Sequence, residues 1–309
     1  MRTTPTKQNI IMRNHKINAT ALLLAACCAI NTARATESGG DTIGAGAEGF
    51  LAGALPPAGL YGVLYYDHYH ASRFNDGNGH SSVPGFGLTA DVVIPRLVYM
   101  SELTVLGGRV GGYALVALPS LNLNVAGTSS SRAGIGDTVV GPMLHWGAGG
   151  ALQTVAALDL SLPTGRYDKN SALNLGKNYT SVRPIFAVSY LPSNGLEASA
   201  KFTYTFNTKN NATDYLSGQL FHFDYSISYA ISSAAKLGIN GYFIKQTTDD
   251  QQYGQEVGSD GFRGQALAIG PAFHYQFSRF GIEVRALKEY AVRNRPAGES
   301  LWTKAVFAF

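Results

Sequence analysis

Two pairs of residues in this 309-residue chain have types and a spacing that could support metal binding or hydrolysis. His68 and His70 form one pair, and His222 and Asp224 form the other. Side chains two positions apart on a β-strand share a face, so each pair would act together on a strand. Because neither pair has a second cluster at metal-ligand spacing, we interpret all four as polar residues of a lumen or rim. A metal site, or half of a His–Ser hydrolase site, is the alternative.

Familiar catalytic motifs are missing from the sequence. It contains no GxSxG and no HExxH segment, and Gly176-Lys177 lacks the upstream glycine of a phosphate-binding loop. We therefore expect no enzymatic activity, no metal and no cofactor. A barrel-embedded lipid-modifying enzyme, built on a Ser/His or Asp/His pair, is the alternative that mutation of His222 and His68 would test.

A larger set of charged residues falls at positions that would face the interior of a closed sheet. Acidic and basic side chains are mixed in this set, whereas an ion-selective pore favours rings of one sign. Opposite charges can pair across the interior and leave a narrow or plugged channel. We therefore expect an uncharged or amphipathic solute. The predicted lumen-lining residues are Asp159, Arg183, Glu197, Lys201, His222, Asp224, Glu283 and Arg285, together with Lys304.

The elements that would position these residues are β-strands. In LFHFDYSISYA (220–230), Phe, Tyr and Ile alternate strictly with His222, Asp224, Ser226 and Ser228. A period of two indicates one apolar and one polar face, which in a membrane barrel face lipid and lumen. The same reasoning predicts about twelve strands, near 61–70, 87–99, 102–118, 135–146, 151–162, 179–190, 196–206, 219–230, 235–246, 265–277, 280–290 and 300–309.

The connections between these strands alternate in length. Short turns are expected around Ser101 and at 147–150, 192–195, 232–234 and 278–279. Long polar connections are expected at 71–86, 119–134, 163–178, 207–218, 247–264 and 291–299. Bacterial outer-membrane barrels show this alternation, with short periplasmic turns and long external loops. The long loops could gate the mouth or contact lipopolysaccharide.

Four prolines conflict with a regular barrel. Pro95, Pro142, Pro184 and Pro271 fall inside predicted strands. Proline cannot donate a hydrogen bond to the strand ladder, and a closed barrel has no edge to accommodate it. We expect local kinks or bulges at these positions, with a lateral opening toward lipid as the alternative.

The first 35 residues have the order of a secretory signal peptide, with a basic region, an apolar segment at 19–30 and an Ala-Arg-Ala cleavage site at 33–35. Cleavage would leave 19 Lys and Arg against 20 Asp and Glu, so the precursor's positive charge gives no support for nucleic-acid binding. It would also remove both cysteines, Cys27 and Cys28. A lipoprotein acylated at Cys27 is the alternative.

The composition agrees with a membrane barrel. Charged residues make up 14% of the chain, below the roughly 25% usual for soluble domains, and there are 17 Tyr and 15 Phe. After the leader no apolar run approaches the roughly 20 residues of a membrane helix. The chain ends LWTKAVFAF, and a terminal Phe309 on an alternating strand is what such barrels present to their assembly machinery.

Several segments resemble the "MetA-pathway of phenol degradation" family of Gram-negative outer-membrane proteins. They are GIGDTVVGPML (134–144), LDLSLPTGRYDKN (158–170), KFTYTFNTKNNATDYLSGQLFHFDY (201–225), KQTTDD (245–250) and KEYAVRNRPAGESLW (288–302). The resemblance spans roughly residues 37–309. It implies a transporter-like role linked to breakdown of aromatic or hydrophobic compounds, and it carries no catalytic residues over to this chain.

Together these observations predict an all-β, transmembrane, antiparallel up-and-down barrel of about 12 strands. Its expected divisions are a cleaved signal peptide (1–35), an N-terminal periplasmic segment (36–60) and the barrel (61–309). We expect a bacterial outer-membrane channel for passive uptake of small hydrophobic or aromatic compounds. Its expected partners are membrane lipid, lipopolysaccharide, the assembly machinery through Phe309, and the solute. A structural barrel with a filled lumen is a further alternative.

Overall fold

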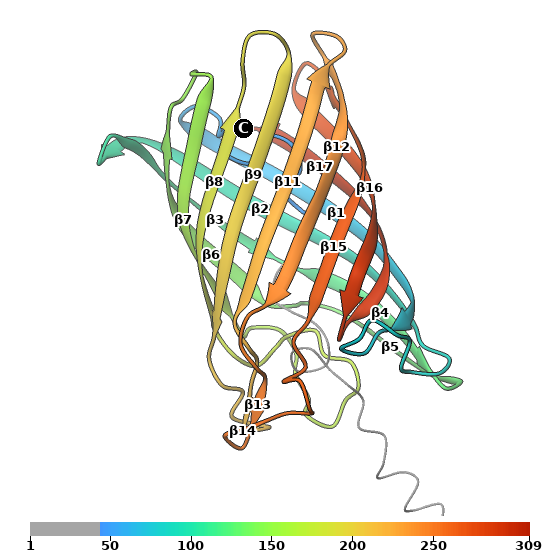
Figure 1. The fold of residues 1–309 in the computed structure, drawn as a ribbon. Coiled ribbons are helices and arrows are strands. Elements are labelled where there is room, and N and C mark those ends of the chain that lie inside the picture. The colour runs from blue at the N-terminus through green and yellow to red at the C-terminus, as the bar shows by residue number, and fades with distance from the viewer. Residues whose placement is uncertain (1–43) are drawn as a thin grey trace, which may run out of the picture. The chain divides into compact units, whose positions relative to one another are not determined.

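Twelve antiparallel strands form the wall of the molecule (Figure 1). The structure is a computed structural model and describes residues 44–309, so the predicted signal peptide and Cys27 lie outside the described residues. The wall strands are β1 (Gly59–Phe74), β2 (Gly87–Val105), β3 (Gly108–Val116), β6 (Thr138–Trp146), β7 (Leu152–Leu162), β8 (Ser181–Tyr190), β9 (Leu196–Asn207), β11 (Leu220–Ala230), β12 (Ala235–Gln246), β15 (Gln265–Gln276), β16 (Phe280–Arg293) and β17 (Pro296–Ala308).

The sheet closes on itself through β1. One edge of β1 pairs with β2 and the other pairs with β17, from Tyr61 opposite Ala308 to Phe74 opposite Pro296. Closure matters because an open sheet edge in lipid would leave backbone groups without hydrogen-bond partners. The predicted all-β barrel of about twelve strands is therefore confirmed. Among the described residues, no helix is long and apolar enough to cross a membrane.

The remaining strands extend the barrel at one end. The predicted long connection at 119–134 is instead a hairpin of β4 (Leu118–Val125) and β5 (Thr128–Ala133). It continues the wall because β4 pairs with the first half of β2, which β3 leaves free. A small separate sheet, formed by β10 (Tyr215–Leu216), β13 (Gln251–Gln252) and β14 (Gln255–Glu256), ties two other connections together.

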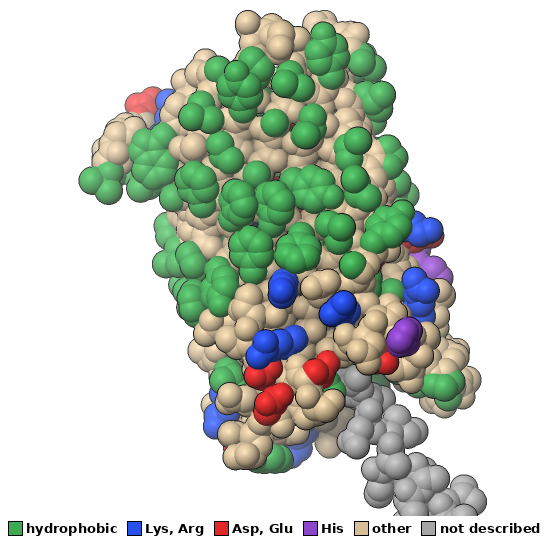
Figure 2. Space-filling view, viewed as in Figure 1, with side chains coloured by type: hydrophobic (Ala, Val, Ile, Leu, Met, Phe, Trp, Pro, Cys, Tyr) green, Lys and Arg blue, Asp and Glu red, His purple; other side chains and the backbone are tan. Residues whose placement is uncertain are grey.

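Alternation along each strand sorts side chains between the two faces of the wall. On β11, Ile227 and Tyr229 are exposed on the outside, while His222, Asp224 and Ser228 are buried on the inside. Figure 2 shows the result as a broad band of hydrophobic side chains on the outer surface, with charged side chains gathered toward the end that carries β13 and β14. The apolar face of the period-two pattern therefore faces outward, as expected for a surface solvated by lipid.

A charge placed in this band should destabilise the barrel according to its depth. Ile227, 60% exposed near the middle of the band, is expected to cost about 2–4 kcal/mol of unfolding free energy when replaced by Arg. Tyr229→Arg, on the same face but next to the end of β11, should cost only about 0–1 kcal/mol. Urea titration of the barrel folded into lipid vesicles would measure both, and equal costs would argue against a lipid-facing outer surface.

The four strand prolines occupy interruptions of the hydrogen-bond ladder, and all four are exposed on the outer face. Strand pairing skips Pro142 between β6 and β7, Pro184 between β8 and β9, and Pro271 between β15 and β16, and resumes in the same register. Pro95 lies where β2 changes partner from β4, which ends at Val93, to β3, which begins at Arg96. Each proline therefore sits where no ladder donor is required. The register is unchanged across Pro142, Pro184 and Pro271, so these three are not the bulges that the sequence led us to consider.

Connections at the two ends of the barrel differ in length. At the short-turn end the strands are joined through 106–107, 147–151, 191–195, 231–234 and 277–279. At the long-loop end most connections are long, namely 75–86, 117–137, 163–180, 208–219 and 247–264. The predicted alternation of short and long connections holds except at 291–299, where we expected a long connection. Strands β16 and β17 run through it, leaving only Asn294 and Arg295 as a turn.

The first short turn was placed wrongly at Ser101. The chain turns at Leu106-Gly107, where both residues have positive φ values, 51° and 75°. Two consecutive positive φ values define the tight hairpin turn whose twist matches the flanking strands. Leucine is a poor marker for such a turn, so residue type pointed to the polar Ser101-Glu102 instead.

Candidate functional site

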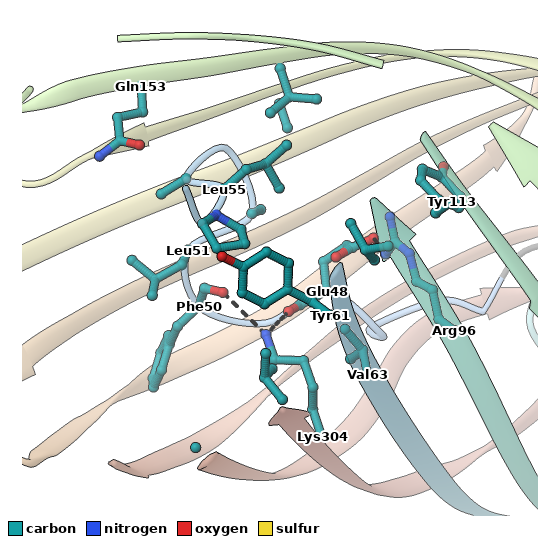
Figure 3. Close-up of a pocket in the computed structure, with 18 of the residues that line it drawn as sticks. Glu48, Phe50, Leu51, Leu55, Tyr61, Val63, Arg96, Tyr113, Gln153 and Lys304 are labelled. Atoms are coloured by element: carbon teal, nitrogen blue, oxygen red, sulfur yellow. Dashed lines mark hydrogen bonds and ion pairs between the residues drawn. The ribbon is translucent and has the colours of Figure 1, made fainter. Parts of the chain in front are cut away.

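The N-terminal segment Gly44–Pro57, here called the plug, lies inside the barrel (Figure 3). We expected residues 36–60 to form a periplasmic segment, and the structure instead places this part against the inner wall. The first described residues of the plug lie in mid-lumen, where Gly46 contacts β11. The plug leaves the lumen at the short-turn end, where β1 begins at Gly59. It thus occupies the half of the lumen nearest the short-turn end.

Wall carboxylates and one hydroxyl hold the plug by its backbone N–H groups. Four wall side chains accept these bonds: Asp224 from Gly46 (2.9 Å), Glu283 from Phe50 (3.1 Å), Glu197 from Leu51 (2.6 Å) and Ser189 from Gly53 (2.8 Å). They stand on β11, β16, β9 and β8. Bonds to ionised acceptors are roughly twice as strong as neutral ones, so the plug is anchored on a wide arc of the wall.

Wall cations hold the plug by its carbonyl groups. Lys304 Nζ donates to the carbonyl oxygens of Glu48 (2.6 Å) and Phe50 (3.2 Å), the two contacts drawn in Figure 3. Arg285 Nη2 donates to the carbonyl of Ala47 at 3.0 Å. The mixed signs predicted for the lumen therefore have a structural use, because a peptide backbone needs both acceptors and donors from its surroundings.

The side chain of Glu48 connects the plug to a third part of the wall. Its Oε1 lies 2.7 Å from Lys201 Nζ on β9 and 3.3 Å from Arg96 Nη1 on β2. Burial by itself would raise the pKa of this carboxyl. The charges of Lys201, Arg96 and Lys304 outweigh burial and hold its pKa well below its ordinary value. Glu48 is therefore ionised at any pH near neutrality and acts as an ionic latch.

Two plug glycines allow close approach to the wall. At Gly53 an added Cβ would lie 2.6 Å from backbone atoms of Val188 and Ser189 on β8. At Gly49 (φ 68°) it would collide with the ion pair of Glu283 and Arg285. A side chain at either position would force the plug off the wall.

Beside the plug is a cavity of about 770 Å³ that opens at the short-turn end. The turn residues Gly149, Leu191 and Arg279 form part of its mouth. Its body is largely apolar, and its inner end is polar (Figure 3). The apolar lining includes Leu51, Leu55, Val63, Val98, Met143, Val155, Ile185 and Val306. Apolar cavities with a few convergent polar groups are typical of small-molecule sites.

A second, smaller space of about 90 Å³ adjoins the cavity on the side of the long loops. Both spaces are bordered by Glu48, Arg96 and Lys201, and the smaller one extends to Asp159 and Arg183. The latch therefore lies between the apolar cavity, on the side of the short turns, and a smaller space that contains the charged pair Asp159 and Arg183. Tyr113 stands at the same boundary, with the Arg96 guanidinium 3.7 Å from its ring centre and its hydroxyl bonded to Asp159.

The structure places all nine predicted lumen residues, Lys304 included, on the inner face. Arg183 pairs with Asp159 at 3.4 Å, Glu283 with Arg285 at 2.6 Å, and Glu197 accepts from Lys236 at 2.6 Å. Lys201 and Glu283 border the cavity, whereas Asp159 and Arg183 border the smaller space. His222 and Asp224 lie 3.2 Å apart, both buried near the plug.

The other histidine pair faces the opposite way. His68 and His70 are on the outer face of β1 toward the long-loop end, and His68 Nδ1 lies 2.8 Å from Asp91. The rim interpretation is therefore supported for this pair and the lumen interpretation is not. Among residues 44–309, the structure contains no group of three or more His, Cys, Asp or Glu arranged to hold a metal ion.

Sequence reasoning missed Glu48, Arg96 and the plug itself. The plug has no period-two or helical pattern, so it gave no strand or helix signal. The usable signal was composition, since GAGAEGFLAG (44–53) contains four glycines around a single charged residue, Glu48. Such a run suits a backbone that must pass close to other groups.

The comparisons with known proteins agree with this fold. A sequence-family model described as "Putative MetA-pathway of phenol degradation" matches residues 71–305. The COG4313 outer membrane channel from Pseudomonas putida F1 has a similar structure, with a TM-score of 0.74 and 20% identity over 87% of this chain and 100% of that one. The KdgM porin aligns with a TM-score of 0.44 and 9% identity, over 80% of this chain and 99% of that one. A search of curated proteins finds no match.

Proposed function

Because the chain belongs to this phenol-degradation family, we propose that it is an outer-membrane channel through which small hydrophobic or aromatic compounds diffuse passively. The closed barrel with a lipid-facing apolar band supports the location. The solved Pseudomonas putida structure of the same fold is described as an outer membrane channel, which supports the role. In this proposal the short-turn end faces the periplasm and the long-loop end faces outward.

The observation that carries the proposal is the apolar cavity beside the plug. A channel for hydrophilic solutes needs a continuous water-filled path, whereas this lumen narrows at Glu48, Arg96 and Lys201 and then opens into an apolar space. Apolar solutes gain about 25 cal/mol per Å² of surface removed from water, so such a space favours them over sugars or ions. No energy source is needed, because the solute moves down its gradient.

The proposal assigns a role to each part of the site. The solute enters at the long-loop end, passes the latch when the plug shifts, and rests in the cavity before leaving between the short turns. The plug is held to the wall by side-chain hydrogen bonds and takes no part in the strand ladder, which suits a segment that moves without unfolding the barrel.

The proposal also covers export, assembly and contact with the membrane. Export would use residues 1–35 as a signal peptide, and Phe309, 81% exposed after the end of β17, would meet the assembly machinery. Lys245, Lys288 and Arg293 are exposed on the outer face at the long-loop end, just beyond the hydrophobic band. Cations at this level suit the phosphate groups of lipopolysaccharide.

Solute uptake into liposomes containing the refolded protein tests the channel. We expect phenol and short fatty acids to accumulate faster than in protein-free liposomes, and small sugars to accumulate no faster. Exclusion of all three solutes by a correctly folded barrel would contradict the proposal. It would favour the second candidate, a structural barrel with a filled lumen, which the presence of the plug supports.

A further inference from the structure

Positive charge dominates the inner end and the mouth of the apolar cavity. Five cationic residues border it against two acidic ones, Glu48 and Glu283. Glu283 already accepts from Arg285 and Lys304, which leaves Glu48 as the partner of Arg96 and Lys201. The cationic residues are Arg96, Arg109, Lys201, Arg279 and Lys304.

Other acidic groups near this end are engaged elsewhere. Asp159 pairs with Arg183 and accepts from the Tyr113 hydroxyl, whereas Asp224 Oδ1 accepts from Gly46 N–H and lies 3.2 Å from His222 Nε2. Glu197 accepts from Lys236 and from Leu51 N–H. Among the described residues, Glu48 is therefore the only carboxylate within ion-pair distance of Arg96 and Lys201.

The two cations and their carboxylate belong to different parts of the molecule. Arg96 and Lys201 stand on β2 and β9, which are fixed by hydrogen bonding on both edges. Glu48 stands on the plug and leaves with it. A plug that shifts would expose two unpaired cations to the lumen, which is costly unless another anion takes the place of Glu48.

We infer that the cavity binds apolar molecules carrying a carboxylate, and that the ligand carboxylate replaces Glu48 on Arg96 and Lys201. This rests on the proposed function and narrows its solutes to amphipathic acids. One carboxylate is exchanged for another, so the charge of the site is conserved. Binding of the ligand and release of Glu48 from Arg96 and Lys201 are then one event, so the ligand itself loosens the plug.

The geometry suits such a ligand. The Arg96 guanidinium lies against the Tyr113 ring, and this stacking orients its N–H groups toward the Glu48 carboxylate. From that point the apolar wall of Val63, Val98 and Met143 extends toward the mouth. A cavity of about 770 Å³ accommodates a phenyl ring with a short acidic chain.

Calorimetric titration of the refolded protein in detergent tests this inference with 4-phenylbutyrate, 4-phenylbutanol and acetate. Wild-type protein should bind 4-phenylbutyrate, and Glu48→Gln should bind it about tenfold more tightly, as expected if the latch leaves the site free in roughly one molecule in ten. Affinity for 4-phenylbutanol should not change between them. Acetate should bind weakly to both, because it lacks the apolar body.

The matched control is Glu299→Gln, which removes the same charge from an exposed position on the outer face of β17. It should leave all three affinities at wild-type values. A second variant, Lys201→Met, should weaken 4-phenylbutyrate binding and spare 4-phenylbutanol. Equal affinity of wild type and Glu48→Gln for 4-phenylbutyrate would overturn the carboxylate site. If liposomes still took up phenol, the channel proposal would stand without it.

Discussion

Gly53→Ala is expected to raise the ion conductance of the barrel several-fold, although it adds a single methyl group. The new Cβ would lie 2.6 Å from backbone atoms of β8, a strand that cannot retreat because both of its edges are paired. The plug must move instead, and the bond from Gly53 N–H to Ser189 is lost with it. Single-channel recording in planar bilayers would detect the change as a larger unitary current.

Gly44→Ala provides the matched control within the same plug. Its Cβ would meet Ala47 at 3.5 Å and Trp302 at 3.6 Å, which are ordinary van der Waals contacts. Conductance should stay at the wild-type value, and both variants should retain the electrophoretic mobility of a folded barrel. If Gly53→Ala also conducts like wild type, the plug does not limit ion flow.

The wall could be predicted from sequence because each strand carries its own amphipathic pattern. Alternating residues such as Phe223 and Asp224 must face different solvents, so parity alone places the side chains of β11 inside or outside. The same argument placed Glu283, Arg285 and Lys201 in the lumen. Parity could not predict which residues pair across the lumen, because it assigns each side chain to a face and gives no position relative to the other strands.

Strand ends were harder to predict, because two hairpins contain residue types that are uncommon at their positions. Leu106 adopts a positive φ in a turn that residue types put at Ser101. The polar residues of 119–134, such as Ser129 and Ser130, suggested a loop, yet they form a hairpin whose β4 edge is satisfied by the unused half of β2. Whether such a segment forms a strand or a loop is decided by its pairing with strands elsewhere in the chain.

The plug could not be predicted from any local pattern. Its structure comes from contacts with the wall strands, for example Gly46 with Asp224, which is 178 residues away in sequence. An N-terminal segment of glycine and alanine has no preference that distinguishes the lumen from the periplasm. The mixed lumen charges did indicate a plugged channel, and Lys304 and Glu283 show why, since both bind the plug backbone.

The buried charge of Glu283 should matter most for stability. Replacing it with Ala should lower the free energy of unfolding by about 3–5 kcal/mol, because Arg285, fully buried, loses its 2.6 Å partner and Phe50 N–H loses its acceptor. Guanidinium titration in detergent, followed by tryptophan fluorescence, would measure the loss. Glu299→Ala, exposed on the outer face of β17, is the matched control and should stay within about 0.5 kcal/mol of wild type.

A double variant separates the two reasons for this cost. If the unpaired guanidinium dominates, Glu283→Ala combined with Arg285→Met should recover most of the lost stability, because an apolar side chain next to Trp302 leaves no buried charge. If the loss of plug anchoring dominates, the double variant should be no more stable than the single one and should conduct more. A Glu283→Ala protein as stable as Glu299→Ala would contradict both, and would mean that water enters the lumen freely enough to solvate Arg285.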